Sequence, residues 1–166
     1  MHASTTIDSP VGPLTLIASD TGLRAVLWPS ERPGRVGVPD DVVERPEHAV
    51  LVVAAAQLRQ YFEGRRTSFE VPLDLHGTDF QKKVWRALAE IPFGETVSYA
   101  EQAARLGDAN KARAVGAANG RNPVSIVLPC HRVVGADGSL TGFAGGLDAK
   151  RFLLQHEADV ARMLQC

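Results

Sequence analysis

Short apolar runs separated by turn residues characterise the first part of the chain. From Thr5 to Pro29, β-prone segments alternate with prolines and glycines, a pattern that predicts a small antiparallel meander of about three strands. The next stretch, Pro29 to Pro46, is rich in proline and glycine and is expected to be a loop. From Glu47 to Phe62, apolar residues recur at helical spacing, which predicts a helix closed by Gly64. The expected inward positions of this helix are Val50, Val53, Ala54, Leu58 and Tyr61.

From about His76 onward the chain has the pattern of a mainly helical region. Two capping boxes, Thr78 to Gln81 and Ser98 to Glu101, each mark the start of a helix. The second box opens a short helix that ends near Gly107, and another helix is expected from Lys111 to Asn119. Two short helices joined by a tight, glycine-containing turn are typical of a helix-turn-helix.

Together these patterns predict an α+β protein with two domains. Residues 1–75 are expected to form a small lobe with a short antiparallel sheet, a helix and the loop 29–46. Residues 76–166 are expected to form a mainly helical domain with a winged-helix-like helix-turn-helix. Composition favours an ordered globular chain, since 45% of the residues are hydrophobic and 22% are charged. No apolar run approaches the roughly 20 residues that span a bilayer, and the first residues do not resemble a signal peptide, so a cytoplasmic protein without membrane contact is expected.

Basic residues concentrate around the predicted helix-turn-helix, although the net charge of the chain is −1. Within residues 105–121 there are four basic residues and one acidic residue. Because local phosphate contacts matter more for DNA affinity than total charge, this region fits either a DNA-binding surface or an ordinary solvated face. The second helix has one face almost bare of side chains, which fits either close helix packing or the approach of a DNA groove. That face consists of Arg113, Gly116, Ala117 and Gly120.

The segment SIVLPCHRVV, residues 125–134, places a polar triplet inside an apolar run. Pro129 cannot donate to a central sheet strand, and His131 and Arg132 both favour the thiolate form of Cys130. Adjacent side chains of an extended chain point to opposite faces. His131 would therefore need either a local bend or a bridging water to act on the sulfur, and it would need an acceptor to orient it. The candidates in the last helix are Asp148, Glu157 and Asp159.

These residues lie within a longer resemblance to a known family. RAVGAANGRNPVSIVLPCHRVVGADGSLTGFAGGL, residues 113–147, resembles the active-site region of the O6-alkylguanine-DNA alkyltransferases. FQKKVWRALAEIPFGETVSYAEQA and FLLQHE extend the likeness from about Thr78 to Glu157. The resemblance implies DNA repair by irreversible transfer of a methyl or alkyl group from O6-alkylguanine, and from O4-alkylthymine, in duplex DNA. Transfer would follow base flipping and would end at Cys130, with one turnover per molecule.

The resemblance also implies roles for individual catalytic residues. Cys130 matches the acceptor, and His131 matches the base, which acts through a water and is oriented by Glu157. Asn122 matches the asparagine that supports the active-site turn. Tyr99 matches the tyrosine that assists flipping and hydrogen-bonds to the base.

Further roles concern DNA and the substrate pocket. Arg113 matches the arginine that enters the duplex in place of the flipped base, and its helix is expected to dock in the minor groove. The implied DNA-binding residues are Tyr99, Arg113, Gly116, Ala117 and Arg121. The implied pocket residues are Val133, Phe143 and Ala144. Some members carry a serine or tyrosine where this chain has Phe143 and Ala144, so a side-chain hydroxyl contact to the substrate is not expected from this loop.

No metal and no cofactor are expected. The amino-terminal lobe has no cysteine to match the zinc ligands of some family members, and Cys166, the last residue, is expected to fray. The expected partner is double-stranded DNA containing alkylated guanine, bound by a monomer, with cooperativity on DNA left open. Two rival interpretations are a non-catalytic helix-turn-helix DNA-binding protein with an incidental thiol and a Cys-His hydrolase. The hydrolase is disfavoured because such dyads are normally assembled from separate segments.

Overall fold

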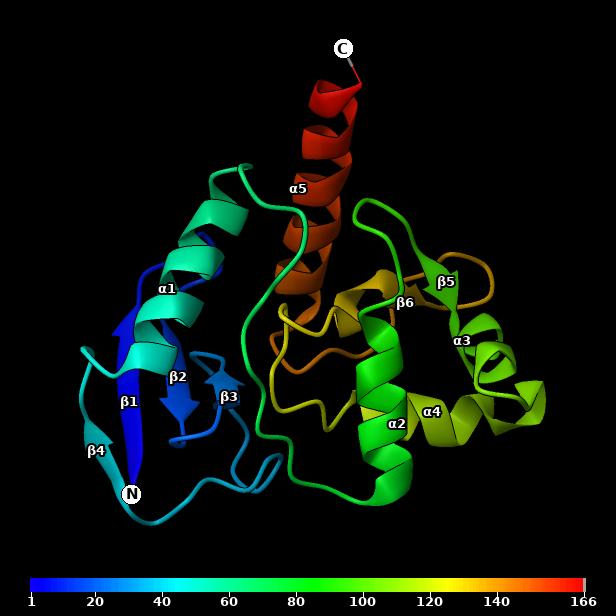
Figure 1. Cartoon of the computed structure of the whole chain (residues 1–166). Coiled ribbons are helices and arrows are strands. Elements are labelled where there is room, and N and C mark those ends of the chain that lie inside the picture. Colours follow the sequence, from blue (N-terminus) through cyan, green and yellow to red (C-terminus); the bar gives the residue numbers. More distant parts are fainter. Residues whose placement is uncertain (166) are drawn as a thin grey trace. The chain divides into compact units, whose positions relative to one another are not determined.

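The computed structural model describes residues 1–165, whose contacts divide the chain into two compact units (Figure 1). Unit 1 comprises Met1–His76 together with Pro123–Val127, and unit 2 comprises Gly77–Asn122 and the chain from Leu128 onward. The sequence patterns did not predict that a five-residue excursion of the later chain, Pro123–Val127, belongs to unit 1. The expected fraying of Cys166 lies outside the described residues.

Unit 1 contains a four-stranded sheet of order β3-β2-β1-β4. Strands β1, His2–Ile7, and β2, Leu14–Ala18, pair antiparallel, and β3, Leu23–Leu27, pairs antiparallel with β2. This is the predicted meander. The fourth strand, β4, Val42–Glu44, pairs parallel with β1, so the prediction of about three strands, and of loop throughout residues 29–46, was wrong there. Three residues are too few for an alternating pattern, and β4 exists through its pairing with β1, which is distant in sequence.

Helix α1, Ala49–Phe62, covers this sheet and contacts β1, β2 and β3. Its buried apolar positions are Val50, Leu51, Ala54, Ala55, Leu58 and Tyr61. Val53, expected to face inward, is 39% exposed, because about 100° of rotation per residue carries it outside this stripe.

The end of unit 1 runs back along β3. Leu23 N donates to Pro72 O at 2.8 Å, and Asp74 N donates to Leu23 O at 3.0 Å. A Cβ on Gly22 would lie 2.6 Å from the backbone carbon of Leu73, so only glycine allows this close approach. Asp74 accepts from the hydroxyl of Ser19 at 2.6 Å, which fixes the segment further.

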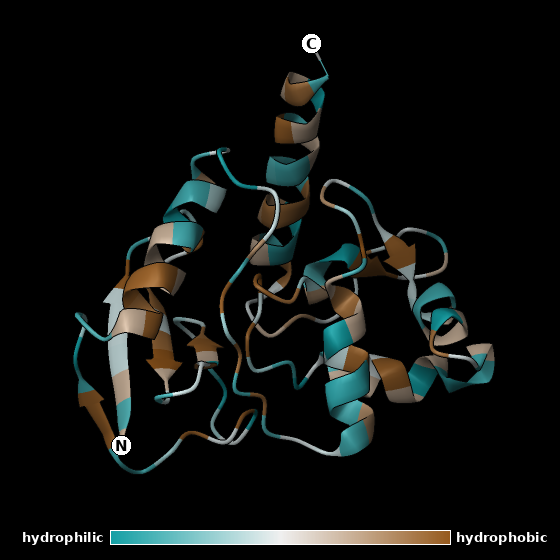
Figure 2. Ribbon diagram, in the orientation of Figure 1, coloured by the Kyte–Doolittle hydropathy of each residue, from teal (hydrophilic) through white to brown (hydrophobic). Residues whose placement is uncertain are grey.

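Unit 2 is mainly helical, as predicted. Its elements are α2 (Asp79–Leu88), β5 (Val97–Ser98), α3 (Tyr99–Arg105), the 3₁₀ turn η1 (Ala109–Lys111), α4 (Ala112–Asn119), the 3₁₀ turn η2 (Cys130–Arg132), β6 (Val133–Val134) and α5 (Leu147–Leu164). Both predicted capping boxes are confirmed, at Thr78 with Gln81 and at Ser98 with Glu101. Strands β5 and β6 pair parallel. The alternation of teal and brown along α2, α4 and α5 in Figure 2 shows their amphipathic character.

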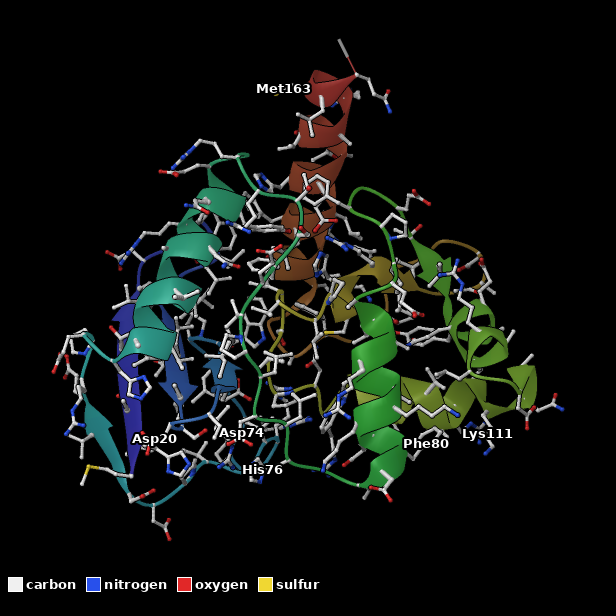
Figure 3. The ribbon with its side chains drawn as sticks, viewed as in Figure 1. Asp20, Asp74, His76, Phe80, Lys111 and Met163 are labelled. Carbon is white, nitrogen blue, oxygen red and sulfur yellow. The ribbon has the colours of Figure 1, made fainter. Side chains whose placement is uncertain are left out.

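The predicted helix-turn-helix is formed by α3, η1 and α4, which specific contacts hold against α2. The indole of Trp85 donates to Ala118 O at 2.7 Å. Lys111 Nζ lies 5.7 Å from the centre of the Phe80 ring, and both residues are labelled in Figure 3. Two buried hydrogen bonds between Gln102 and Asn119 join α3 to α4. Among the described residues, no helix is both long and apolar enough to span a membrane.

Candidate active site

Cys130 begins a single 3₁₀ turn, η2, rather than lying in an extended strand. The carbonyl of Leu128 accepts the Cys130 N–H at 2.9 Å and the side-chain N–H of Asn122 at 2.8 Å. Of the two arrangements that the sequence left open, a local bend or a bridging water, the local bend is therefore present at Cys130 and His131. With about three residues per turn, adjacent side chains diverge by about 120° instead of pointing to opposite faces. The Cys130 thiol is buried, with 7% of the residue exposed.

Asn122 and Leu128 lie at the two ends of the excursion into unit 1. Asn122 is completely buried, and its hydrogen bond to Leu128 O closes the base of this excursion. Within it, Ile126 has a φ of 74°, a left-handed conformation that is costly for a β-branched residue. The turn that presents Cys130 thus follows directly from a closed and strained loop.

Three buried charged or polar side chains form a cluster beside Cys130. His131 Nε2 donates to Glu157 Oε2 at 2.7 Å. Arg132 donates to both oxygens of Glu157, from Nε at 2.8 Å and from Nη2 at 3.1 Å, and also to Ile91 O at 2.6 Å. Of the three carboxylates considered from the sequence, Glu157 is thus the one that contacts His131.

The other two carboxylates have different partners. Asp148 pairs with Arg151 at 2.9 Å on the exposed side of α5, and Asp159 pairs with Arg162 and Gln155.

The surroundings of the cluster determine its protonation. Burial lowers the pKa of His131, and the opposing effect of Glu157 does not overcome it. Burial alone would raise the pKa of Glu157, but the hydrogen bonds and charges of His131 and Arg132 hold it far below its usual range. At neutral pH the pair therefore consists of a neutral imidazole and a carboxylate. Because Nε2 carries the hydrogen bonded to Glu157, Nδ1 is the nitrogen that can accept a proton. Nδ1 is buried and has no hydrogen-bond partner among the described residues.

Lys150 is a buried residue of the site that was not predicted. It is 1% exposed, and its Nζ donates to Val133 O at 2.7 Å. Burial lowers the pKa of Lys150, and its interaction with Cys130 opposes that shift. Its spacing could have revealed it, because it shares the buried stripe of α5 with Leu153, Glu157 and Val160.

Tyr99 joins the helix-turn-helix to the loop after β6. Its hydroxyl lies 2.6 Å from the hydroxyl oxygen of Thr141, a loop residue that was not predicted either. On its other side, the Tyr99 ring packs against α4, since a Cβ on Gly116 would lie 3.5 Å from the ring carbon Cδ1. Val133 is fully buried, Phe143 and Ala144 are half-buried, and Lys150 Nζ lies 5.9 Å from the Phe143 ring centre.

The predicted DNA-binding residues form a more open surface. Arg113, Ala117 and Arg121 are exposed, and Gly116 is half-buried. Val115 and Ala118 are buried on the opposite side of α4. Within residues 1–165, no group of three or more His, Cys, Asp or Glu side chains is arranged to hold a metal ion.

Comparison with known proteins places this site in a family. The model for the DNA binding domain of 6-O-methylguanine DNA methyltransferase matches residues 79–159, and the model for its ribonuclease-like domain matches residues 3–75. The methylated-DNA–protein-cysteine methyltransferase of Methanosarcina barkeri is 47% identical over 156 residues, covering 94% of this chain and 97% of the relative. The protein of the same name from Mycobacterium tuberculosis is 49% identical over 152 residues, covering 92% of this chain and 90% of the relative. The crystal structure of Mycobacterium tuberculosis OGT in complex with DNA is similar with a TM-score of 0.86 and 46% identity, covering 96% of this chain and 93% of that one.

Proposed function

The chain belongs to the family of methylated-DNA–protein-cysteine methyltransferases, and we propose that Cys130 is the cysteine that accepts the alkyl group. It is an enzyme that binds DNA and repairs it by direct reversal. The observation that carries the assignment of Cys130 is its position beside the buried hydrogen bond of His131 to Glu157. A buried thiol next to an imidazole that is oriented by a carboxylate has the parts of an activated nucleophile.

In the proposed reaction, His131 takes the thiol proton at Nδ1, through a bridging water. The imidazolium that forms is stabilised by Glu157, which remains ionised because Arg132 holds both of its oxygens. The thiolate of Cys130 attacks the alkyl carbon, forming the S–C bond while the C–O6 bond breaks. Tyr99 supplies a proton to the departing guanine at O6. Asn122 maintains the turn by fixing Leu128 O.

Substrate binding requires the alkylated base to leave the stack, because a protein thiolate cannot otherwise reach its substituent. The exposed face of α4 would dock in the minor groove, with Arg113 filling the space of the flipped base and with Gly116, Ala117 and Arg121 alongside. Val133, Phe143 and Ala144 would line the pocket. The substrates would be O6-alkylguanine and O4-alkylthymine in duplex DNA.

The thioether product limits each molecule to one turnover, because no group of the proposed site can hydrolyse or reduce it. A monomer is expected to bind DNA. The cytoplasmic location expected from the sequence stays a prediction.

A direct test is to incubate the protein with a duplex containing O6-methylguanine and to analyse its peptides by mass spectrometry. The expected result is one added methyl group on Cys130 per molecule, and no adduct in Cys130→Ala. An adduct on another residue, or more methyl groups removed than protein molecules added, would contradict the assignment. A non-catalytic DNA-binding protein would protect cells equally well with and without Cys130→Ala.

A further inference from the structure

The loop after β6 supplies a hydroxyl group to Tyr99. Phe143 and Ala144 offer none, but the Thr141 hydroxyl oxygen lies 2.6 Å from that of Tyr99. This distance is at the short end of the range for O–H···O hydrogen bonds. Thr141 comes from the loop, whereas Tyr99 is the first residue of α3, so the contact joins two parts of unit 2 that are 42 residues apart in sequence.

Both partners of this contact are held in place by their surroundings. The Tyr99 ring lies against the backbone of α4 at Gly116. The loop before Thr141 forms a tight turn, in which Gly135 N donates to Ser139 O at 2.9 Å and Gly138 N donates to Gly135 O at 2.8 Å. The Tyr99 hydroxyl is therefore preorganised from the helix side and from the loop side.

We propose that Thr141 is a positioning residue for alkyl transfer, which holds the Tyr99 hydroxyl and stabilises its oxygen as the proton leaves. This inference rests on the proposed function, in which Tyr99 protonates the departing guanine. A hydroxyl can donate one hydrogen bond while it accepts others. Tyr99 can thus donate to the base while it accepts from Thr141. As the proton moves from Tyr99 to guanine O6, negative charge develops on the phenol oxygen, and the hydrogen bond from Thr141 becomes charge-assisted and stronger.

The proton transfers of this reaction balance, and water is the only other molecule that gives or takes a proton. The Cys130 proton moves to His131, the S–C bond forms, the C–O6 bond breaks, and the Tyr99 proton moves to the guanine. His131 then loses its proton to water, and Tyr99 regains one from water. The role of Thr141 is confined to the interval in which the Tyr99 oxygen is charged.

The test compares single-turnover rates of methyl transfer to Cys130 at saturating O6-methylguanine duplex for wild type, Thr141→Val, Thr141→Ser and Tyr99→Phe. Thr141→Val is expected to slow transfer by about tenfold, the effect of losing one hydrogen bond to a charged group. Thr141→Ser keeps the hydroxyl and should restore a near wild-type rate. In a Tyr99→Phe background, Thr141→Val should cause no further loss, because Thr141 acts through the Tyr99 oxygen. Thr67→Val, which makes the same substitution at an exposed position of unit 1, serves as the control and should leave the rate unchanged.

The contact itself is tested without DNA by urea unfolding of the same variants. The losses of stability from Tyr99→Phe and Thr141→Val should be less than additive in the double variant. The inference is overturned if Thr141→Val transfers methyl groups at the wild-type rate, if Thr141→Ser is as slow as Thr141→Val, or if the two losses of stability simply add. It is also overturned if Thr141→Val slows the Tyr99→Phe protein as much as the wild type. Failure of the proposed function is a distinct result, in which the wild-type protein acquires no methyl group on Cys130.

Discussion

Arg132 is the residue whose charge compensates Glu157 inside unit 2. It is 5% exposed and Glu157 is 1% exposed, and the guanidinium contacts both carboxylate oxygens. Because the positive charge of Arg132 lies against the negative charge of Glu157, the buried pair has a net charge of zero. His131 can then accept a proton beside a carboxylate that stays ionised. Arg132 thereby influences the protonation of the proposed base through its charge and through its hydrogen bonds to Glu157.

Replacing Arg132 by methionine is expected to destabilise the protein strongly. The change leaves Glu157 buried without its countercharge, and breaking a buried ion pair costs about 3–5 kcal/mol. Urea unfolding monitored by circular dichroism measures the loss. Arg151→Ala is the matched control on α5, because its pair with Asp148 is exposed and should contribute only about 0–1 kcal/mol. Equal losses for the two variants would show that the buried pair contributes no more than a surface pair.

The residues of the site differ in how far the sequence could predict them. Cys130 and His131 were identifiable because the neighbouring imidazole and guanidinium of His131 and Arg132 are costly in an apolar run unless they interact. The residues alone left three carboxylates open as the partner of His131, because the orientation of α5 is set by tertiary packing, and only the family resemblance favoured Glu157. Thr141 could not be predicted, since a loop threonine carries no pattern and its partner Tyr99 lies 42 residues away.

Helix α4 has a buried face and a more open face, and the open face includes Gly116 in the middle of the helix. Gly116→Ala is expected to stabilise the free protein by up to about 1 kcal/mol, because alanine has the higher helix propensity. Space permits the change, since the added Cβ would make ordinary contacts at 3.5 Å and 3.6 Å with the Tyr99 ring. DNA affinity should fall by about tenfold, because a methyl group on a close-packed docking face costs about 1–3 kcal/mol.

Thermal unfolding and fluorescence anisotropy with a short duplex measure these two effects. Ala114→Gly is the control on an exposed position of α4, where it should lower stability by about 1 kcal/mol and leave DNA affinity unchanged. Unaltered DNA binding by Gly116→Ala would mean that the backbone of α4 does not approach the duplex at this point.

Among the helices and strands, the sequence predicted those features that depend only on residues close together in the chain. The capping boxes of α2 and α3 depend on residues three positions apart, so the sequence contains them completely. Strand β4 and the 3₁₀ turn at Cys130 depend instead on partners that lie outside their own segments. The first needs the edge of β1, and the second needs Asn122 to hold Leu128 O. No periodicity over neighbouring residues could have indicated either one.

The whole molecule should lose stability as the pH falls below about 6.5. Burial lowers the pKa of His131 from 6.5, so below that pH the unfolded chain binds a proton that the folded chain does not. The free energy of unfolding therefore decreases as the pH falls from 6.5 toward the folded-state pKa. The pKa of Glu157 is likewise lowered from 4.5, with a further decrease below that pH.

Urea unfolding between pH 8 and pH 4 measures this dependence. His131→Asn should flatten the curve between about pH 6.5 and pH 5, because the titrating group is gone. The exposed His76 pairs with Asp74 at the surface, and His76→Asn is the control that should retain the wild-type slope. A wild-type curve that stays level from pH 7 to pH 5 would contradict the assignment of a neutral, buried His131.

The stability of unit 1 should depend on the excursion Pro123–Val127, although these residues are distant in sequence from the rest of the unit. Val26 N donates to Pro123 O at 2.8 Å, and the indole of Trp28 donates to the Ser125 hydroxyl at 3.3 Å. Val124 and Ile126 are at most 1% exposed, and burying two such side chains contributes about 3–6 kcal/mol. That amount is comparable with the whole stability of many small domains, about 5–15 kcal/mol.

A fragment of residues 1–76 is therefore expected to be largely unfolded or marginally stable. Adding PVSIV, residues 123–127, through a flexible glycine-serine linker should restore a cooperative thermal transition, whereas a linker ending in a scrambled order of the same five residues should not. Circular dichroism and amide proton dispersion in NMR spectra distinguish the three polypeptides by their content of ordered sheet. If the fragment 1–76 alone unfolds cooperatively at the same temperature as the version with the native segment, the contacts of β3 with the excursion do not stabilise unit 1. The excursion would then act only on the turn at Cys130, through the Asn122 hydrogen bond that closes it.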